Sequence, residues 1–225
     1  MNYKYIVLDF GNVIVTPTSG DWNLTPKFLE LIDIDKININ ILKESINKYN
    51  YILSEKLLTL DEEYEMFLRF YSSILKYIDY SNYSKIAEEI AYNRTYNNDK
   101  YRLCDNIVEE LSELKEKYTL IMLSDNWPCV IPYMKDNNIY DYFDKLYVSS
   151  IYGVEKKDKV FFDYPISDYN IKLGEALFID DNELNLKIAK EKGFDILLMD
   201  RYCNNNESEY TVINNLKKIS IIKSR

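Results

Sequence analysis

Short runs of apolar residues, each followed at once by a polar side chain, recur along this chain. Three of them end in groups that can carry chemistry: Ile6–Leu8 before Asp9, Leu120–Leu123 before Ser124, and Leu177–Ile179 before Asp180 and Asp181. Runs this short and this continuously apolar predict strands buried on both faces of a parallel sheet. Ligands bind at the carboxyl edge of such sheets. The pattern therefore predicts one polar site assembled from three strand ends.

A second pattern, with apolar residues spaced by three and four, predicts helices from about Thr25 to Asn97. It divides into three pieces: Lys36–Lys56, Leu57–Ile78 and Asn82–Asn97. The central piece begins with Thr59 and Glu62 at the spacing of a capping box. Since no strand pattern interrupts this stretch, we expect residues 16–96 to form a small all-helical domain inserted after the first strand.

Beyond Asp105 the pattern alternates between helix and strand. Helices are predicted at Ile107–Tyr118, Pro128–Asn137, Val160–Asn170, Leu184–Lys192 and Ser208–Ile219, and strands at Thr119–Leu123, Leu146–Ser149, Ala176–Ile179 and Ile196–Met199. Pro165 predicts a break in the third of these helices. Repeated strand–helix units are typical of the α/β class with a doubly wound parallel sheet. We assign that sheet to residues 1–15 and 97–225.

The composition of the chain excludes several kinds of catalytic site and disfavours some binding partners. The 225 residues carry a net charge of −9 and include no histidine, which excludes a His-based triad, a His zinc site and a His general base. The acidic balance disfavours nucleic-acid binding. No apolar run approaches the length of a membrane span. Three cysteines outside any CxxC pair predict free thiols and hence a cytoplasmic protein.

The predicted strand ends combine into a recognisable chemical set. Asp9 could serve as a nucleophile or a metal ligand, and it would repel the carboxylates of Asp180 and Asp181 unless a cation lay between them. Oxygen ligands of this kind predict Mg²⁺. Ser124 begins a loop whose N–H groups could face an anion, and Lys156 could neutralise it. Such a set suits phosphoryl transfer, with Asp9 able to form an aspartyl-phosphate.

The order and spacing of these residues along the sequence resemble those of the haloacid dehalogenase superfamily. The resemblance covers Tyr3–Val15 and about Ile107–Asp200, with motifs at Asp9, at Ser124, within Gly153–Asp158, and from Phe178 through Asp180 and Asp181 to Asn185. In the third motif a lysine usually precedes proline. Here Lys156 is followed by Lys157, so the sequence leaves open which of the two reaches the site.

The resemblance implies an Mg²⁺-dependent phosphatase acting on a small phosphorylated metabolite, with the inserted helices as a cap that selects the substrate. It implies that Asp9, Ser124 and Lys156 are catalytic, and that Ser124, Lys156, Asp125 and Asn126 bind substrate. The metal ligands would be Asp9, the backbone carbonyl of Gly11, Asp180 and Asp181. Trp22 and Arg69 in the cap are weaker candidates for substrate contact. The sequence does not identify the substrate or the oligomeric state.

One position departs from the family pattern. Family phosphatases carry a second aspartate two residues after the nucleophile, as general acid and base, and this chain has Gly11 there. The resulting first motif, Asp-x-Gly-Asn-Val from Asp9 to Val13, resembles a sugar-phosphatase-like branch of the family, so the departure does not exclude phosphatase activity. Asp125 and Asp21 are the candidate replacements. The departure leaves two alternatives open: a metal-independent 2-haloacid dehalogenase-like hydrolase, and a degenerate protein that binds phosphate without turnover. The acidic pair argues against the first, and the retained Asp9, Ser124 and Lys156 argue against the second.

Overall fold

A six-stranded parallel sheet forms the centre of the computed structural model, which describes residues 3–97, 99–203 and 208–219. Its strands lie in the order β5-β4-β1-β6-β7-β8 and comprise β1 (Tyr5–Leu8), β4 (Thr119–Ser124), β5 (Lys145–Val148), β6 (Ala176–Asp180), β7 (Asp195–Met199) and β8 (Val212–Ile213). β1 lies at the middle, paired with β4 on one side and β6 on the other. The three strands whose ends carry the predicted site are therefore neighbours.

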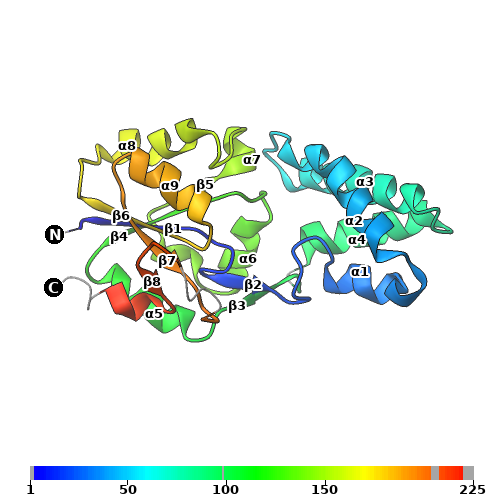
Figure 1. Cartoon of the computed structure of the whole chain (residues 1–225), viewed down its shortest axis with the longest axis horizontal. Helices are drawn as coiled ribbons and strands as arrows, with labels where there is room; N and C mark the ends of the chain where they lie inside the picture. Colours follow the sequence, from blue (N-terminus) through cyan, green and yellow to red (C-terminus); the bar gives the residue numbers. More distant parts are fainter. Residues whose placement is uncertain (1–2, 98, 204–207, 220–225) are drawn as a thin grey trace.

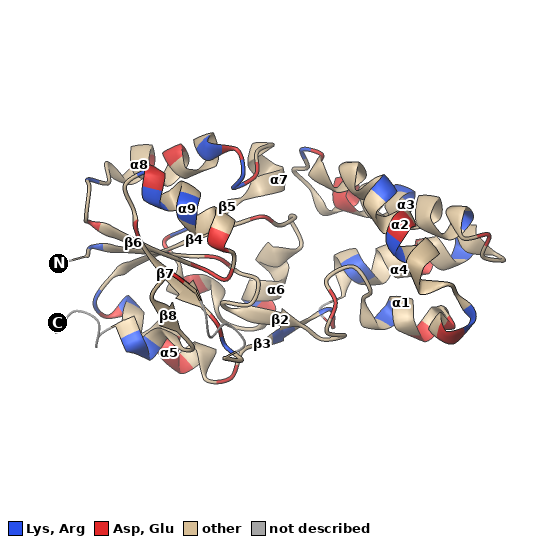
Figure 2. Cartoon of the chain, viewed as in Figure 1, with Lys and Arg blue, Asp and Glu red and all other residues tan. Residues whose placement is uncertain are grey.

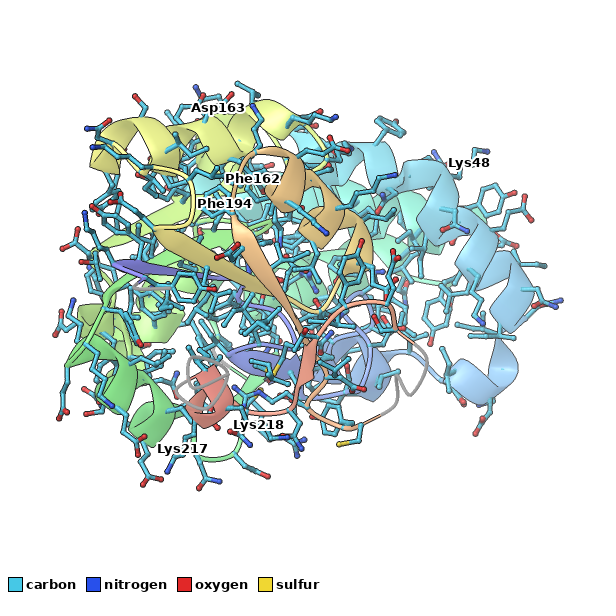
Figure 3. All side chains as sticks on the ribbon, turned by 60° about the vertical axis from the view of Figure 1, so that its left-hand side comes forward. Lys48, Phe162, Asp163, Phe194, Lys217 and Lys218 are labelled. Carbon is cyan, nitrogen blue, oxygen red and sulfur yellow. The ribbon has the colours of Figure 1, made fainter. Side chains whose placement is uncertain are left out.

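Helices cover both faces of this sheet (Figure 1). They are α5 (Ile107–Lys115), α6 (Val130–Asp136), the short α7 (Ser149–Tyr152), α8 (Asp163–Tyr169) and α9 (Glu183–Glu191). Each face has its own apolar core, one under α5 and α6 and one under α9. In the second core Phe162 and Phe194 lie side by side with ring centroids 5.9 Å apart (Figure 3). This two-layer covering confirms the predicted α/β, doubly wound class.

Four further helices stand beside the sheet rather than on it (Figure 1). They are α1 (Pro26–Leu31), α2 (Ile39–Tyr49), α3 (Leu60–Tyr77) and α4 (Tyr83–Tyr96), packed around a separate apolar cluster that includes Phe67, Phe70 and Ile74. The predicted capping box is present, since Thr59 Oγ1 accepts from Glu62 N and Glu62 Oε2 accepts from Thr59 N. We call these helices the cap; its limits at residues 16 and 96 stay a prediction.

Two short strands that the sequence pattern did not reveal join the cap to the sheet domain. β2 (Val15–Pro17) and β3 (Tyr101–Leu103) pair antiparallel, with Val15 opposite Leu103. Pro17 ends the first of these strands. The chain thus enters and leaves the cap through one two-stranded ribbon.

One prediction about the later chain is wrong. Ser208–Ile219 forms no long helix: Val212–Ile213 adds strand β8 to the sheet, and a single 3₁₀ turn follows at Leu216–Lys218. Burial of Ile213 at the sheet edge outweighs the helical pattern. The predicted Val160–Asn170 helix is divided just before Pro165, into a 3₁₀ turn at Lys159–Phe162 and α8. Pro165 itself lies in the first turn of α8, where a missing N–H costs no intrahelical bond. Among the described helices, none combines the length and apolarity that crossing a membrane requires.

Candidate active site

The loop after β1 places the first carboxylate of the site. Asp9 is 7% exposed, and its backbone N–H donates to Ile179 O of the neighbouring strand. Asn12 then turns the chain with a left-handed φ of 51°, a conformation that asparagine tolerates better than most residues. This turn aims Asn12 Nδ2 at Asp181 Oδ2, 2.7 Å away. The loop therefore links the ends of β1 and β6 directly.

Lys156 brings a buried cation between two of the predicted carboxylates. Its Nζ donates to Asp180 Oδ2 at 2.7 Å and lies 2.9 Å from Asp9 Oδ1, while the residue itself is 2% exposed. The contact with Asp9 is close but lacks hydrogen-bond geometry, so Asp9 Oδ1 is left without a hydrogen-bond donor. Such an oxygen is available to another cation or to an incoming phosphorus atom.

The structure also answers which of the two adjacent lysines reaches the site. Gly153 ends α7 with a positive φ of 73°, which favours glycine, and the chain then returns toward β4. Lys156 N donates to Asp125 Oδ1 at 2.9 Å, which fixes this return. The side chain of Lys157 is 70% exposed and pairs with Glu155 instead. Lys156 is therefore the lysine at the site.

Asp180 is the most enclosed carboxylate of the group, with no exposed surface. Besides Lys156, it accepts from the backbone N–H of Asn182 at 2.8 Å and from Asn185 Nδ2 at 3.1 and 3.3 Å. Asn182 in turn caps α9 by accepting from Leu184 N. Asn185 thus orients Asp180 from the first turns of α9, which fits its place in the fourth motif.

The three carboxylates can present one oxygen each within a space fit for an ion. Ligand atoms of Asp9, Asp180 and Asp181 all lie within 4.8 Å of one another. Hard carboxylate oxygens of this kind suit Mg²⁺, which prefers an octahedron of oxygens completed by water or substrate. Asp9 Oδ1, which receives no hydrogen bond although the Lys156 ammonium lies close to it, is a further point in favour. These residues therefore fit the predicted metal, and Asp9, Asp180 and Asp181 would hold it together with the Gly11 carbonyl.

Burial and the neighbouring charges together shift the pKa values of these groups. Burial raises the pKa of Asp180 above its ordinary value, and the nearby Asp9 charge adds to this while Lys156 opposes it. Burial likewise raises the pKa of Asp181. Burial alone would lower the pKa of Lys156, but the carboxylates of Asp180 and Asp9 raise it well above its ordinary value. The lysine therefore stays charged and offsets part of the negative charge.

Ser124, Asp125 and Asn126 follow one another at the end of β4, as predicted. Ser124 is 1% exposed, and Asn126 is held by donating its N–H to Ser149 Oγ at 3.0 Å. Asn126 Oδ1 accepts from Trp127 N and from Tyr101 Oη. The Asp125 side chain is exposed, yet the protein around it removes enough water to raise its pKa to about 6.

Trp22 lies directly against Gly11. A Cβ built on Gly11 would meet Trp22 ring carbons at 3.3 and 3.4 Å and Asp9 Oδ2 at 4.0 Å. The indole therefore occupies the space into which a side chain at position 11 would extend, beside the predicted nucleophile. Arg69, the other cap candidate, is exposed and pairs with Glu55. Asp21 accepts from Asn23 N and Leu24 N and so shapes the turn before α1.

A cluster of buried charges at the junction of cap and sheet domain escaped the sequence interpretation. Glu63 of α3 is fully buried, and its Oε2 accepts from Cys129 N at 2.7 Å. Arg94 of α4 is 4% exposed, donates to Trp22 O at 2.9 Å, and lies over the Phe67 ring at 4.3 Å. Both occur in helical stretches where Glu and Arg normally face solvent. Only the three-dimensional packing reveals them.

Comparison with known proteins places this geometry in a family. The sequence model of the haloacid dehalogenase-like hydrolases matches residues 30–199. The chain is also 34% identical over 89 residues to a D-ribitol-5-phosphate phosphatase of Bacteroides thetaiotaomicron. That match covers 36% of this chain and 43% of the phosphatase, so the similarity spans less than half of the curated relative.

Solved structures show the same fold at low identity. The HAD-hydrolase YfnB of Bacillus subtilis, solved bound to magnesium, has a TM-score of 0.69 at 20% identity, covering 99% of each chain. A HAD family enzyme of Bacteroides thetaiotaomicron, in complex with magnesium and inorganic phosphate, has a TM-score of 0.63 at 20% identity, over 92% of this chain and 97% of that one. The L-2-haloacid dehalogenase of Xanthobacter autotrophicus has a TM-score of 0.63 at 13% identity, over 99% and 98%.

Proposed function

We propose that this chain, which belongs to the haloacid dehalogenase-like hydrolase family, is an Mg²⁺-dependent phosphatase of a small phosphorylated metabolite. The observation that carries the proposal is the position of Asp9, which shares a cluster of three carboxylates with Asp180 and Asp181 and lies 2.9 Å from Lys156 Nζ. This arrangement supports Asp9 as the nucleophile, because a divalent cation and the Lys156 ammonium could both hold a phosphate beside it.

The residues of the site divide the reaction between them. An Asp9 oxygen attacks phosphorus, the bond to the leaving oxygen breaks, and an aspartyl-phosphate forms on Asp9. Lys156 and Ser124 hold the phosphate oxygens and offset the charge that builds on them. A bound Mg²⁺ would neutralise further phosphate charge and orient the group for in-line attack. Water then hydrolyses the aspartyl-phosphate and restores the carboxylate.

Several observations support the substrate class. The curated relative acts on a phosphorylated polyol, and one structural relative holds inorganic phosphate with magnesium. In Figure 2 the Lys and Arg residues of the described chain are interspersed with Asp and Glu on both the cap and the sheet domain, a distribution that disfavours a nucleic-acid substrate. A small phosphorylated metabolite, met in the cytoplasm, fits these features best.

The inserted helices would act as the substrate-selecting lid. Hydrogen bonds join the cap to the sheet domain, among them Leu57 N to Ser150 O, Trp127 Nε1 to Leu53 O, and Cys129 N to Glu63 Oε2. Contacts at this seam lie beside the loops that carry Asn126 and Lys156. Closure of such a lid removes water and supplies the differential contacts that distinguish substrates.

Two other functions remain to be tested against this one. The fold is shared with a 2-haloacid dehalogenase, but a metal-independent enzyme has no use for the Asp9, Asp180 and Asp181 cluster. A protein that binds phosphate without turnover would explain Gly11, but not the buried contact between Lys156 and Asp9.

A screen of phosphorylated metabolites and of 2-haloacids, each with Mg²⁺ and with chelator, distinguishes the phosphatase, the dehalogenase and the phosphate-binding protein. Phosphate release that needs Mg²⁺ and is lost in Asp9→Asn supports the phosphatase. Halide release in chelator would support the dehalogenase. Saturable phosphate binding without any turnover would support the binding protein.

A further inference from the structure

The proposed phosphatase needs a group beside Asp9 that can give and take a proton. Phosphate esters of ordinary alcohols leave as strongly basic alkoxides, and general acid catalysis of that departure is worth roughly 10² to 10⁴ in rate. Position 11 does not supply the acid, because it is glycine and the Trp22 ring carbons lie 3.3 and 3.4 Å from a Cβ built there. The sequence contains no histidine. The proton must therefore come from another side chain.

Asp125 is a carboxyl group that the fold links to both residues proposed to hold the phosphate. It follows Ser124, the last residue of β4, directly in the chain. Its Oδ1 accepts from Lys156 N at 2.9 Å, and the Nζ of the same lysine lies 2.9 Å from Asp9 Oδ1. The position of Asp125 is thereby fixed relative to the serine, the lysine and the proposed nucleophile.

The second oxygen of Asp125 is available for chemistry. Among the described residues none donates a hydrogen bond to Oδ2, and the residue is exposed. The surrounding protein nevertheless removes enough water to raise the pKa of Asp125 to about 6, while Lys156 opposes this shift and Asp9 adds to it. Both protonation states are therefore populated near neutral pH, as a group that acts first as acid and then as base requires.

The other carboxyl groups considered for this site have different tasks. The hydrogen bonds of Asp21 lie within its own turn, where it accepts from Asn23 N and Leu24 N. Asp180 and Asp181 belong to the cluster that fits a metal ion. Of these groups, Asp125 combines a link to the phosphate-holding residues with an oxygen that is free to meet a substrate.

We propose that Asp125 is the general acid and base of this site, in place of the aspartate that family phosphatases carry at the position of Gly11. This proposal rests on the proposed phosphatase activity and adds a catalytic residue to it. An Asp9 oxygen bonds to phosphorus as the bond to the leaving oxygen breaks. The electron pair of the broken bond stays on the leaving oxygen, which takes the proton of Asp125.

The second step returns that proton. A water oxygen bonds to phosphorus, and the Asp125 carboxylate takes one of the water protons. The bond between phosphorus and Asp9 breaks, and its electron pair restores the Asp9 carboxylate. Inorganic phosphate leaves, and Asp125 is again protonated for the next substrate.

Asp125→Asn tests this role, because asparagine keeps an acceptor for Lys156 N but cannot exchange a proton. The probes are p-nitrophenyl phosphate, whose leaving anion is weakly basic, and phenyl phosphate, whose leaving anion is more basic. We expect the wild-type kcat/KM values for the two esters to lie within about tenfold of each other, because the acid assists the poorer leaving group. The variant should lose about 10² in kcat/KM with phenyl phosphate and little with p-nitrophenyl phosphate.

The role as a base has its own signature in kcat. With p-nitrophenyl phosphate the variant should form the aspartyl-phosphate normally but hydrolyse it slowly. A stoichiometric burst of nitrophenolate should then precede slow release of phosphate, with kcat lowered about 10² or more. A residue that only supports the loop would not separate kcat from kcat/KM in this way.

An equal loss of kcat/KM with both esters would overturn the proposal, and so would a selective loss with phenyl phosphate in Asp21→Asn instead of Asp125→Asn. If Asp125→Asn does not fold, the wild type decides: a kcat/KM about 10² lower for phenyl phosphate than for p-nitrophenyl phosphate would mean that no acid assists. Absence of Asp9-dependent turnover with every phosphate would instead overturn the phosphatase itself.

Discussion

Lys156 Nζ donates to Asp180 Oδ2 at 2.7 Å in a place where the lysine is 2% exposed and the aspartate fully buried. A buried ion pair gains little over apolar packing, but breaking it by removing one partner is costly. Here the lysine also lies beside Asp9, so one ammonium compensates two carboxylates. The site is therefore stable without a divalent cation only as long as this ammonium is present.

Lys156→Met should accordingly lower the free energy of unfolding in chelator by about 3–5 kcal/mol, because it leaves two buried carboxylates without their cation. Millimolar Mg²⁺ should restore part of that loss, since it binds the folded protein alone. Urea denaturation with and without Mg²⁺ measures both effects. Lys157→Met, on the exposed neighbour, is the matched control and should change little. Equal stability of the two variants in chelator would contradict this account of the pair.

The proposed metal ligands should contribute unequally to the affinity for Mg²⁺. Asp180 is fully buried and pairs with Lys156, whereas Asp181 is only partly buried and its Oδ2 already accepts from Asn12 Nδ2 at 2.7 Å. We expect Asp180→Asn to weaken Mg²⁺ binding at least about tenfold, equivalent to about 1.4 kcal/mol, and Asp181→Asn to weaken it less. Calorimetric titration of the substrate-free protein measures both. An unchanged affinity in Asp180→Asn would remove this residue from the metal site.

The buried carboxyl group of Glu63 predicts that the stability of the folded protein depends on pH. Burial raises its pKa from 4.5 to about 7, although the Cys129 N–H, Lys100 and Arg94 oppose the shift. The folded state therefore binds this proton more tightly than the unfolded chain, and its contribution is fully present below pH 4.5 and lost as pH rises to 7. A shift of this size corresponds to about 3 kcal/mol.

Glu63→Gln keeps the hydrogen-bond acceptor for Cys129 N and removes the titration. Urea denaturation at pH 5 and pH 8 should show the wild type losing more stability than the variant over this interval. Glu65→Gln, an exposed position on the same helix, should follow the wild type. If Glu63→Gln and the wild type lose the same amount, Glu63 is not the buried acid that the structure indicates.

The parallel sheet and the polar residues at its carboxyl edge could be predicted, because both depend on short patterns of apolar and polar residues in the sequence. Apolar runs ending in Asp9, Ser124 and Asp180 identify strands and strand ends at once, and parallel pairing brings those ends together. The wrongly predicted helix at Ser208–Ile219 shows the limit of this argument. A two-residue strand such as Val212–Ile213 is too short to leave a periodic signal, and only the free edge of β7 determines it.

The rest of the site depends on contacts that no local pattern encodes. Whether Lys156 or Lys157 faces inward is decided by the Asp125 hydrogen bond to Lys156 N, formed across 31 positions of sequence. Burial of Glu63 and Arg94 follows from cap docking, because on isolated helices both would face water. Trp22 against Gly11 is a tertiary contact of the same kind.

The central claim, that Asp9 is the nucleophile of an Mg²⁺-dependent phosphatase, is tested most directly by trapping the covalent intermediate. Enzyme mixed with p-nitrophenyl phosphate and Mg²⁺ is quenched in acid within a single turnover, and the peptides are examined by mass spectrometry. We expect a phosphoryl group on the peptide that contains Asp9, dependent on Mg²⁺ and lost in Asp9→Asn together with nitrophenol release. Full turnover by Asp9→Asn, or by the wild type in chelator, would contradict the account.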